Sequence, residues 1–148
     1  MLTPHDGEFT RLRQVSLVPA GSRFQETLDL AAEIGCTILR KGRCTLVGSP
    51  LDDDVAYAVD AGHSWAATPG SGDVLAGLAG ARMARVAASF GENPEFVHTE
   101  VDEALNDAAN IHAGAALLAA DTAFGTAPAP ASRIAAYIRE ATAILTQR

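Results

Sequence analysis

Apolar residues recur along this chain at helical spacing, and short apolar runs lie between the helical segments. Leu28, Ala31 and Ile34 are three residues apart, which predicts one face of an amphipathic helix. Ser22 suits the residue that precedes this helix, and Gly35 suits the residue that ends it. Both boundaries and the periodicity therefore predict a helix between Ser22 and Gly35.

A shorter helix is predicted at the start of the chain. Thr3 suits an N-cap, Pro4 suits the first helical position, and Asp6 falls where it resembles the acidic partner of a capping box. This pattern predicts a helix over residues 4–12.

The middle of the chain favours strands and the remainder favours helices. Apolar runs at residues 36–39, 45–47 and 55–59 predict three short strands. Apolar stripes predict helices over about 72–89, 101–119 and 134–145, with Ser132 capping the last. Together these elements predict a single α/β layered domain over residues 1–148. Three strands are few for five helices, and residues 1–2 look like the end of another strand. We therefore expect the chain to be the later part of a larger fold.

Composition narrows the function classes. The chain has 148 residues, of which 48% are hydrophobic and 20% charged, and its formal net charge is −7. It contains no run of Lys and Arg and no basic-aromatic patch, which argues against nucleic-acid binding. No apolar run reaches membrane-spanning length, and the start lacks the features of a signal peptide. We expect a cytoplasmic protein. The two cysteines and the histidines lack zinc-ligand spacing, so no protein metal site is expected.

A glycine-rich loop before the 72–89 helix carries the clearest chemistry. The sequence from Gly70 through Ser71 and Gly72 to Asp73 leads directly into an apolar run. Glycine allows a sharp turn and a close backbone approach, and the first N–H groups of a helix favour an anion. An acid beside an anion site is suited to moving a proton. An ordinary turn, with Asp73 favoured only by the helix dipole, remains the alternative.

Three segments together resemble a known family. They are residues 2–9 (Leu-Thr-Pro-His-Asp-Gly-Glu-Phe), residues 40–45 (Arg-Lys-Gly-Arg-Cys-Thr) and residues 70–77 (Gly-Ser-Gly-Asp-Val-Leu-Ala-Gly). In this order they resemble the ADP/ATP-dependent NAD(P)HX dehydratases, the carbohydrate-kinase-like branch of the ribokinase superfamily. The resemblance covers essentially the whole chain and implies the C-terminal part of a three-layer α/β/α sandwich.

The resemblance also implies an activity and site residues. Members of the family use a nucleotide to remove water from hydrated NADH or NADPH. His5 matches the histidine that contacts the hydrated nicotinamide, and Asp73 matches the acid at the substrate. Gly72 matches a glycine that contacts the nucleotide. The segment that lines the nucleotide is matched by Lys41, Gly42, Arg43, Cys44 and Thr45.

The chemistry of these residue types fits that activity. Hydroxide is a poor leaving group, and phosphorylation of the hydroxyl makes a good one. Such a step needs a base, donors for the phosphoryl group and positive charge. Asp73 suits the base, the N–H groups of Gly70, Ser71 and Gly72 suit the donors, and Lys41 supplies charge. A divalent ion such as Mg²⁺ is expected between the phosphates.

Two other functions stay open. A ribokinase-like kinase for a small alcohol, such as a vitamin precursor or a sugar, would need the same loop and the same acid. A non-catalytic nucleotide-binding module is the third candidate. As a fragment of a parallel sheet it would expose apolar edges, which predicts self-association into a homo-oligomer. One departure from the family pattern also stands out, because Asp6 occupies a position where the family commonly carries proline.

Overall fold

The computed structural model describes residues 1–51, 54–90 and 97–147. Its elements in chain order are α1 (Asp6–Val15), α2 (Arg23–Ile34), β1 (Ile38–Arg40), β2 (Cys44–Gly48), β3 (Ala56–Asp60), α3 (Ser71–Phe90), α4 (Val97–Ala120), β4 (Asp121–Thr122), β5 (Gly125–Thr126), α5 (Ala131–Ala136) and α6 (Ile138–Thr146).

The main sheet has the strand order β1-β2-β3, and both pairings are antiparallel. Leu2 and His5 add isolated parallel bridges to Ile38 and Lys41. The backbone N–H of Leu39 donates to the carbonyl of Leu2 at 2.9 Å. The first residues therefore extend the sheet beside β1, as the strand-like residues 1–2 suggested. The expectation of a parallel sheet is wrong for β1, β2 and β3, because short hairpin connections join them antiparallel.

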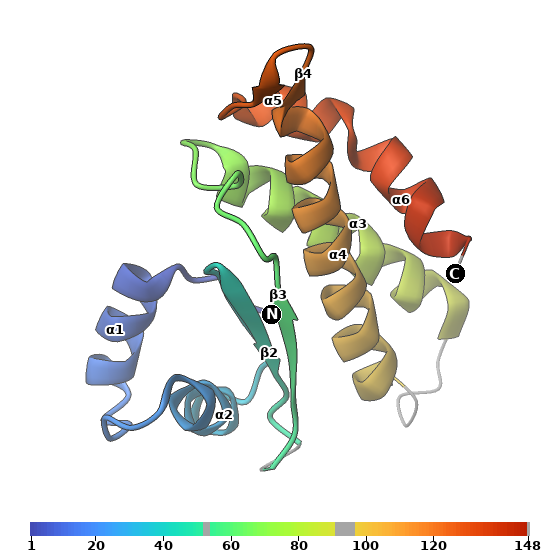
Figure 1. The fold of residues 1–148 in the computed structure, drawn as a ribbon. Coiled ribbons are helices and arrows are strands. Elements are labelled where there is room, and N and C mark those ends of the chain that lie inside the picture. Colours follow the sequence, from blue (N-terminus) through green and yellow to red (C-terminus); the bar gives the residue numbers. More distant parts are fainter. Residues whose placement is uncertain (52–53, 91–96, 148) are drawn as a thin grey trace.

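Helices cover both faces of the sheet, which gives the predicted three layers (Figure 1). The α1 and α2 helices lie on one face, where Phe9, Leu30 and Ile38 belong to one buried cluster. The α3 and α4 helices lie on the other, where a second cluster joins Leu39 and Val47 of the sheet to alanines and leucines of these helices. The α5 and α6 helices pack against α4 on the far side from the sheet.

The predicted start of the first helix is wrong. The α1 helix begins at Asp6, and His5 rather than Thr3 is its N-cap, with Glu8 completing the capping box. Pro4 is not helical, because its carbonyl accepts a 2.8 Å hydrogen bond from the N–H of Lys41 in the sheet. Pairing with β1 thus holds the chain extended until His5.

The sequence predicts the end of α2 correctly, but not the start or the continuity of the last helix. Gly35 ends α2 in the left-handed conformation, with φ of 70°, as predicted. The predicted last helix is interrupted at Tyr137, which separates α5 from α6. Ser132 is not its cap, because α5 begins at Ala131 with Pro130 as the N-cap. Within the described part of the chain, no helix has both the length and the apolar character needed to cross a lipid bilayer.

Candidate functional site

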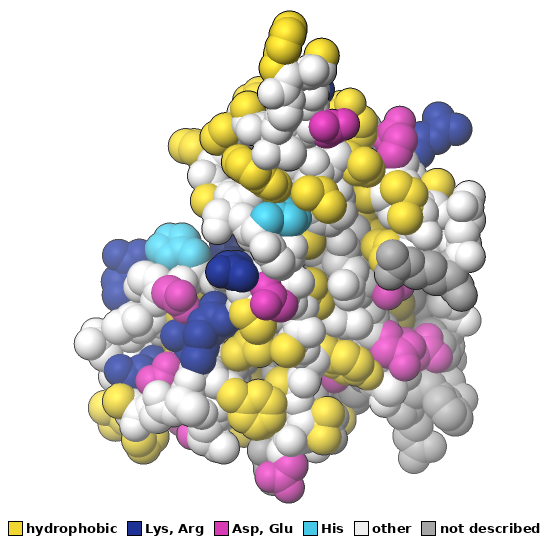
Figure 2. All heavy atoms as spheres, viewed as in Figure 1, with side chains coloured by type: hydrophobic (Ala, Val, Ile, Leu, Met, Phe, Trp, Pro, Cys, Tyr) yellow, Lys and Arg dark blue, Asp and Glu magenta, His cyan; other side chains and the backbone are white. Residues whose placement is uncertain are grey.

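A pocket of about 440 Å³ lies beside the middle of α4. It is lined by the first residues of the chain, the segment after β1, the loop after β3 and the start of α3. On the face of the molecule drawn in Figure 2, histidine, basic and acidic side chains lie close together near the middle. The residues of the family-like segments that line the pocket are His5, Lys41, Gly42, Arg43, Thr45, Ser71 and Gly72. Segments that are far apart in the sequence thus meet in one cavity, as the site prediction requires.

Three of the predicted site residues stay outside the pocket lining: Cys44, Gly70 and Asp73. Asp73 is exposed in the first turn of α3, next to Gly72. Successive residues of a helix point about 100° apart, so Asp73 faces a different direction from Gly72. The catalytic role of Asp73 stays a prediction.

The first turn of α3 combines a tight loop with a nearby cation. Gly70 has a φ of 84°, a conformation that favours glycine. Its carbonyl accepts hydrogen bonds from the N–H groups of Asp73 and Val74, at 3.1 and 3.2 Å. A Cβ on Gly72 would lie 3.3 Å from the ammonium nitrogen of Lys41. The absence of that Cβ lets the ammonium approach the positive end of the helix, and both features favour an anion.

Glu8 connects His5 to Lys41. Its Oε2 accepts a 2.8 Å hydrogen bond from the His5 N–H and lies 3.8 Å from the Lys41 ammonium. The hydrogen bond from the His5 backbone, and then the Lys41 charge, hold the pKa of Glu8 below its usual value despite some desolvation. Glu8 is therefore ionised near neutral pH. This contact places Glu8 among the charged groups around Lys41.

The ring of His5 is oriented by its capping role. Its Nδ1 accepts hydrogen bonds from the N–H groups of Gly7 and Glu8, at 3.0 and 3.2 Å. A neutral ring that accepts at Nδ1 carries its proton on Nε2. Nε2 is therefore the His5 atom that can donate to a ligand, and it lies 3.5 Å from a Glu8 carboxylate oxygen.

His112 joins the middle of α4 to the start of α3. Its Nε2 lies 3.0 Å from the Ser71 carbonyl oxygen and 3.0 Å from the Ser71 hydroxyl. A carbonyl only accepts, so the hydrogen bond to it requires the proton on Nε2. Burial lowers the pKa of His112, and the hydrogen bond to the Ser71 backbone opposes that shift. His112 is thus neutral near pH 7, and it fixes the residue that precedes Gly72.

Other pocket residues carry no sequence motif. His63, Ser64, Ala66 and Ala67 come from the loop after β3. Their segment shows neither periodicity nor characteristic spacing. For His112, the detectable signal is a histidine on an otherwise apolar helical stripe, which predicts a buried ring but not its partner.

A family model named Carb_kinase and described as NAD(P)H-hydrate dehydratase matches residues 1–140. The chain belongs to this family. A bifunctional NAD(P)H-hydrate repair enzyme Nnr from Corynebacterium glutamicum is 44% identical over 160 residues, covering 97% of this chain and 27% of that protein. An ADP-dependent (S)-NAD(P)H-hydrate dehydratase from Neisseria meningitidis is 33% identical over 126 residues, covering 83% of this chain and 41% of that protein.

The Nnr protein of Mycobacterium leprae is 40% identical and is matched over 98% of this chain and 28% of its own length. The chain thus spans between about a quarter and two fifths of the length of these relatives. Membership in the dehydratase family and the ribokinase-like fold of its matched region agree with the three segments quoted from the sequence.

Proposed function

We propose that this chain carries nucleotide-binding and substrate-binding groups of an ADP- or ATP-dependent NAD(P)H-hydrate dehydratase. The observation that supports the proposal most strongly is the convergence of His5, Lys41 and Gly72 on one pocket. The chain's family and the names of its relatives agree with that substrate class.

The nucleotide phosphates are proposed to lie between Lys41 and the first turn of α3. The Lys41 ammonium, the Arg43 guanidinium and the N–H of Gly72 would offset and bind phosphate charge there. The described residues contain no group of three His, Cys, Asp or Glu side chains that could hold a metal ion. Mg²⁺ commonly binds through phosphate oxygens and few protein ligands, and no residue of this chain is proposed as its ligand.

Asp73 is proposed as the base. It takes the proton of the substrate hydroxyl while that oxygen forms a bond to the transferred phosphoryl group and the bond to the nucleotide leaving group breaks. Phosphate then departs with the C–O electron pair, and loss of a ring proton restores the double bond of the reduced nicotinamide. His5 Nε2 is proposed to donate a hydrogen bond to the hydrated ring.

The activity is measured as recovery of NADH absorbance from NADH hydrate in the presence of ADP or ATP. The expected result is recovery that requires both the nucleotide and the hydrate. Nucleotide consumption that depends on a small alcohol, with no NADH recovered, would favour the kinase alternative instead. Nucleotide binding to the pocket is monitored through the NMR shifts of Lys41 and Gly72. Absence of such binding would contradict both the dehydratase proposal and the kinase alternative.

An Asp73→Asn variant tests the proposed base. Turnover is expected to fall by a factor of about 100 or more, because a positioned base contributes on this scale, while nucleotide affinity is retained. Asp121→Asn, an exposed acid in β4, serves as the control and is expected to behave as the wild type. Wild-type turnover in Asp73→Asn would rule out proton abstraction by this residue.

The assignments of a single domain over residues 1–148, of the cytoplasm as compartment and of a homo-oligomer stay predictions. Size-exclusion chromatography with light scattering tests the last of these. A mass of one chain at working concentrations would contradict it.

A further inference from the structure

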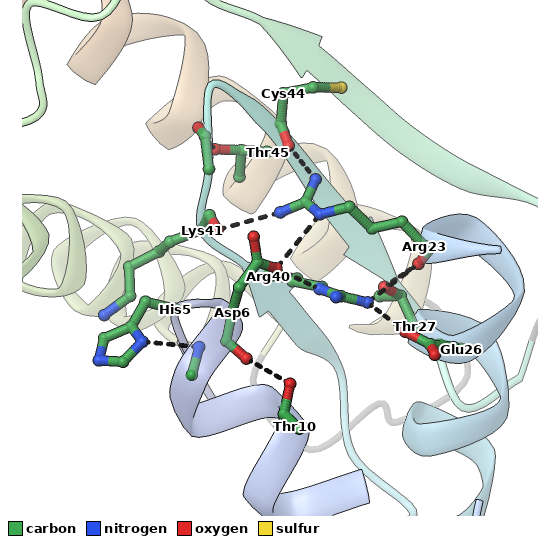
Figure 3. A network of polar contacts seen from close by, with 12 residues as sticks. His5, Asp6, Thr10, Arg23, Glu26, Thr27, Arg40, Lys41, Cys44 and Thr45 are labelled. Atoms are coloured by element: carbon green, nitrogen blue, oxygen red, sulfur yellow. Dashed lines mark hydrogen bonds and ion pairs between the residues drawn. The ribbon is translucent and has the colours of Figure 1, made fainter. Parts of the chain in front are cut away.

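One arginine of α2 holds both sides of the segment that follows β1. The guanidinium of Arg23 donates through Nη2 to the carbonyl of Lys41 at 3.0 Å and through Nη1 to the carbonyl of Cys44. Figure 3 shows Arg23 reaching this segment from α2, while the Lys41 side chain and the His5 ring lie on the opposite side. The two carbonyls flank Gly42 and Arg43, so a single planar group fixes the span of the turn.

The same guanidinium leaves no room for a side chain at the centre of the turn. A Cβ on Gly42 would lie 2.6 Å from Nη2 of Arg23 and 3.3 Å from the carbonyl oxygen of Cys44. A contact of 2.6 Å requires one of the groups to move. The close fit of glycine and arginine therefore sets how the backbone of residues 41–44 lies against α2.

Arg23 is itself held by neighbouring groups. Its Nε donates to Asp6 at 3.3 Å, and the same carboxylate oxygen accepts a 2.7 Å hydrogen bond from Nε of Arg40. Arg40 also donates to the carbonyl of Arg23 at 3.3 Å and to Glu26 at 3.0 Å. Burial acts to raise the pKa of Asp6, but the hydrogen bond from Arg40 and the two arginine charges outweigh it and lower the pKa. Asp6 is ionised and keeps the guanidinium aimed at the turn.

We propose that Arg23 is a positioning residue for the nucleotide, acting through the backbone of residues 41–45. This inference rests on the proposed function, because it takes Lys41 and its neighbours as nucleotide ligands. Arg23 does not line the pocket. It holds the carbonyl of Lys41 on one side, so that the Lys41 ammonium reaches the first turn of α3 on the other.

The chemistry of arginine makes the proposal testable by a conservative change. Lysine keeps the charge, but its ammonium is a single point and cannot reproduce a planar two-carbonyl grip. Arg23→Lys and Arg23→Ala are therefore both expected to loosen the turn. Arg13→Lys is the matched control, since Arg13 belongs to the same layer, pairs with Glu26 and donates to the carbonyl of Val18 instead.

The first readout needs no nucleotide. Hydrogen exchange of the backbone amides of residues 41–45 is measured by NMR in each ligand-free protein. Both Arg23 variants are expected to raise exchange in this segment roughly tenfold, which is the scale of one lost charge-assisted hydrogen bond. Amides in the middle of α4 and in β3 are expected to keep their wild-type exchange, which shows that the fold is retained.

The second readout is the dissociation constant of ADP, measured by calorimetry. Wild-type chain and Arg13→Lys are expected to bind equally, and both Arg23 variants about tenfold more weakly, because a misplaced Lys41 loses part of its phosphate contact. A uniformly destabilised protein would instead show raised exchange throughout, with ADP affinity little changed under folding conditions.

Gly42→Ala adds a test of the contact itself. In the wild-type background the new methyl group displaces the guanidinium, and ADP affinity is expected to fall about as far as in Arg23→Ala. With Arg23→Ala already present, the same methyl is expected to cost much less, because neighbouring residues that share a contact are not additive. Full additivity of the two changes would contradict the proposed contact.

The outcomes distinguish failure of the proposed nucleotide site from failure of the proposed role of Arg23. Absence of ADP binding to the wild-type chain overturns the proposed nucleotide site and this inference with it. ADP binding by the wild type with unchanged exchange at residues 41–45 in both Arg23 variants overturns the inference alone. Raised exchange with wild-type ADP affinity also overturns it. Raised local exchange together with weaker ADP binding, absent from Arg13→Lys, supports it.

Discussion

Both faces of the main sheet bury an apolar cluster, but they differ in the polar interactions that accompany it. On the α1 and α2 face, charged side chains meet at partly buried positions, and Arg40 and Glu26 pair at 3.0 Å with side chains only 8% and 12% exposed. On the α3 and α4 face, the buried cluster contains alanines such as Ala79 and Ala108, both fully buried. Hydrogen bonds to charged groups are directional, whereas apolar packing is not. The first face thus fixes individual atoms beside the pocket, and the second fixes the distance between helices.

Removal of Arg40 is expected to have the largest effect on stability. Arg40→Met keeps the aliphatic length, but it leaves Asp6 and Glu26 without their shared partner and removes the contact of the guanidinium with the Phe9 ring. We expect the free energy of unfolding to fall by about 3 kcal/mol, the scale on which a broken buried pair destabilises. Chemical denaturation measures this.

The exposed Arg139 on α6 offers a control, because Arg139→Met is expected to change the unfolding free energy by less than about 0.5 kcal/mol. Equal stability of Arg40→Met and the wild type would mean that the charged face contributes specificity without stability.

An enlarged residue in the alanine face is the next largest change. Ala79→Leu places three additional carbons against Leu39, Leu105 and Ala108 of the same cluster. Overpacking of a close-packed core is expected to cost about 2 kcal/mol, measured by thermal and chemical unfolding. Ala81→Leu, at an exposed position of the same helix, is expected to be nearly neutral. A stabilised Ala79→Leu would show that this face is loosely packed.

The two faces are expected to lose stability in different pH ranges as the solution is acidified. The pKa of His112 is lowered mainly by burial, so below the ordinary pKa of 6.5 the unfolded chain binds a proton that the folded chain does not. Stability is therefore present above about pH 6.5 and declines as the pH falls toward the folded pKa, by at most about 1.4 kcal/mol per pH unit. The slope of unfolding free energy against pH is expected to be smaller in His112→Asn. An unchanged slope would contradict this assignment.

The carboxylates of the charged face act at lower pH. For Glu26, burial raises the pKa, but hydrogen bonds from the Gly21 backbone and Arg40 and the charge of Arg13 bring it below 4.5. With the folded pKa below the unfolded one, its stabilisation is present above about pH 4.5 and is lost as the pH falls through the folded pKa. The Asp6 contribution has the same sign.

The smallest effect is expected at the outer rim of the alanine face. Arg82 and Asp107 are 3.5 Å apart, and the Asp107 side chain is 61% exposed. An exposed ion pair is screened by water and salt, so Arg82→Ala is expected to cost about 0.5 kcal/mol or less. A larger loss, measured by chemical denaturation at low and high salt, would show that charge also holds the α3–α4 pair.

Local signals made part of this fold predictable. The end of α2 at Gly35 needs only a glycine after an apolar stripe, and both lie within a few residues. The start of α1 was mispredicted because its cause is not local: pairing of the Pro4 carbonyl with Lys41 delays the helix until His5. The same long-range pairing brings His5 to the pocket.

The candidate site also combines residues that local segments of the sequence reveal with residues that only long-range contacts reveal. Lys41, Gly42 and Gly72 stand in recognisable segments, and the structure places all three in the pocket lining. His112 acts through contacts with Ser71, which lies 41 positions away in the sequence. Arg23 acts through carbonyls of a segment that begins 18 positions away, at Lys41. No spacing rule reports such contacts. Asp6 likewise reads as a helix-start acid in the sequence, and only the fold shows its pairing with Arg40 and Arg23.

Arg23 contacts the turn at main-chain oxygens, which every amino acid possesses. The Arg43 side chain, which lines the pocket, is therefore not needed for the contact between Arg23 and the turn. Mutational drift at position 43 can change what the pocket admits while the backbone of residues 41–44 keeps its shape. In directed evolution toward another nucleotide, a library at position 43 offers chemical variety at little structural risk, whereas Gly42 is best left unvaried.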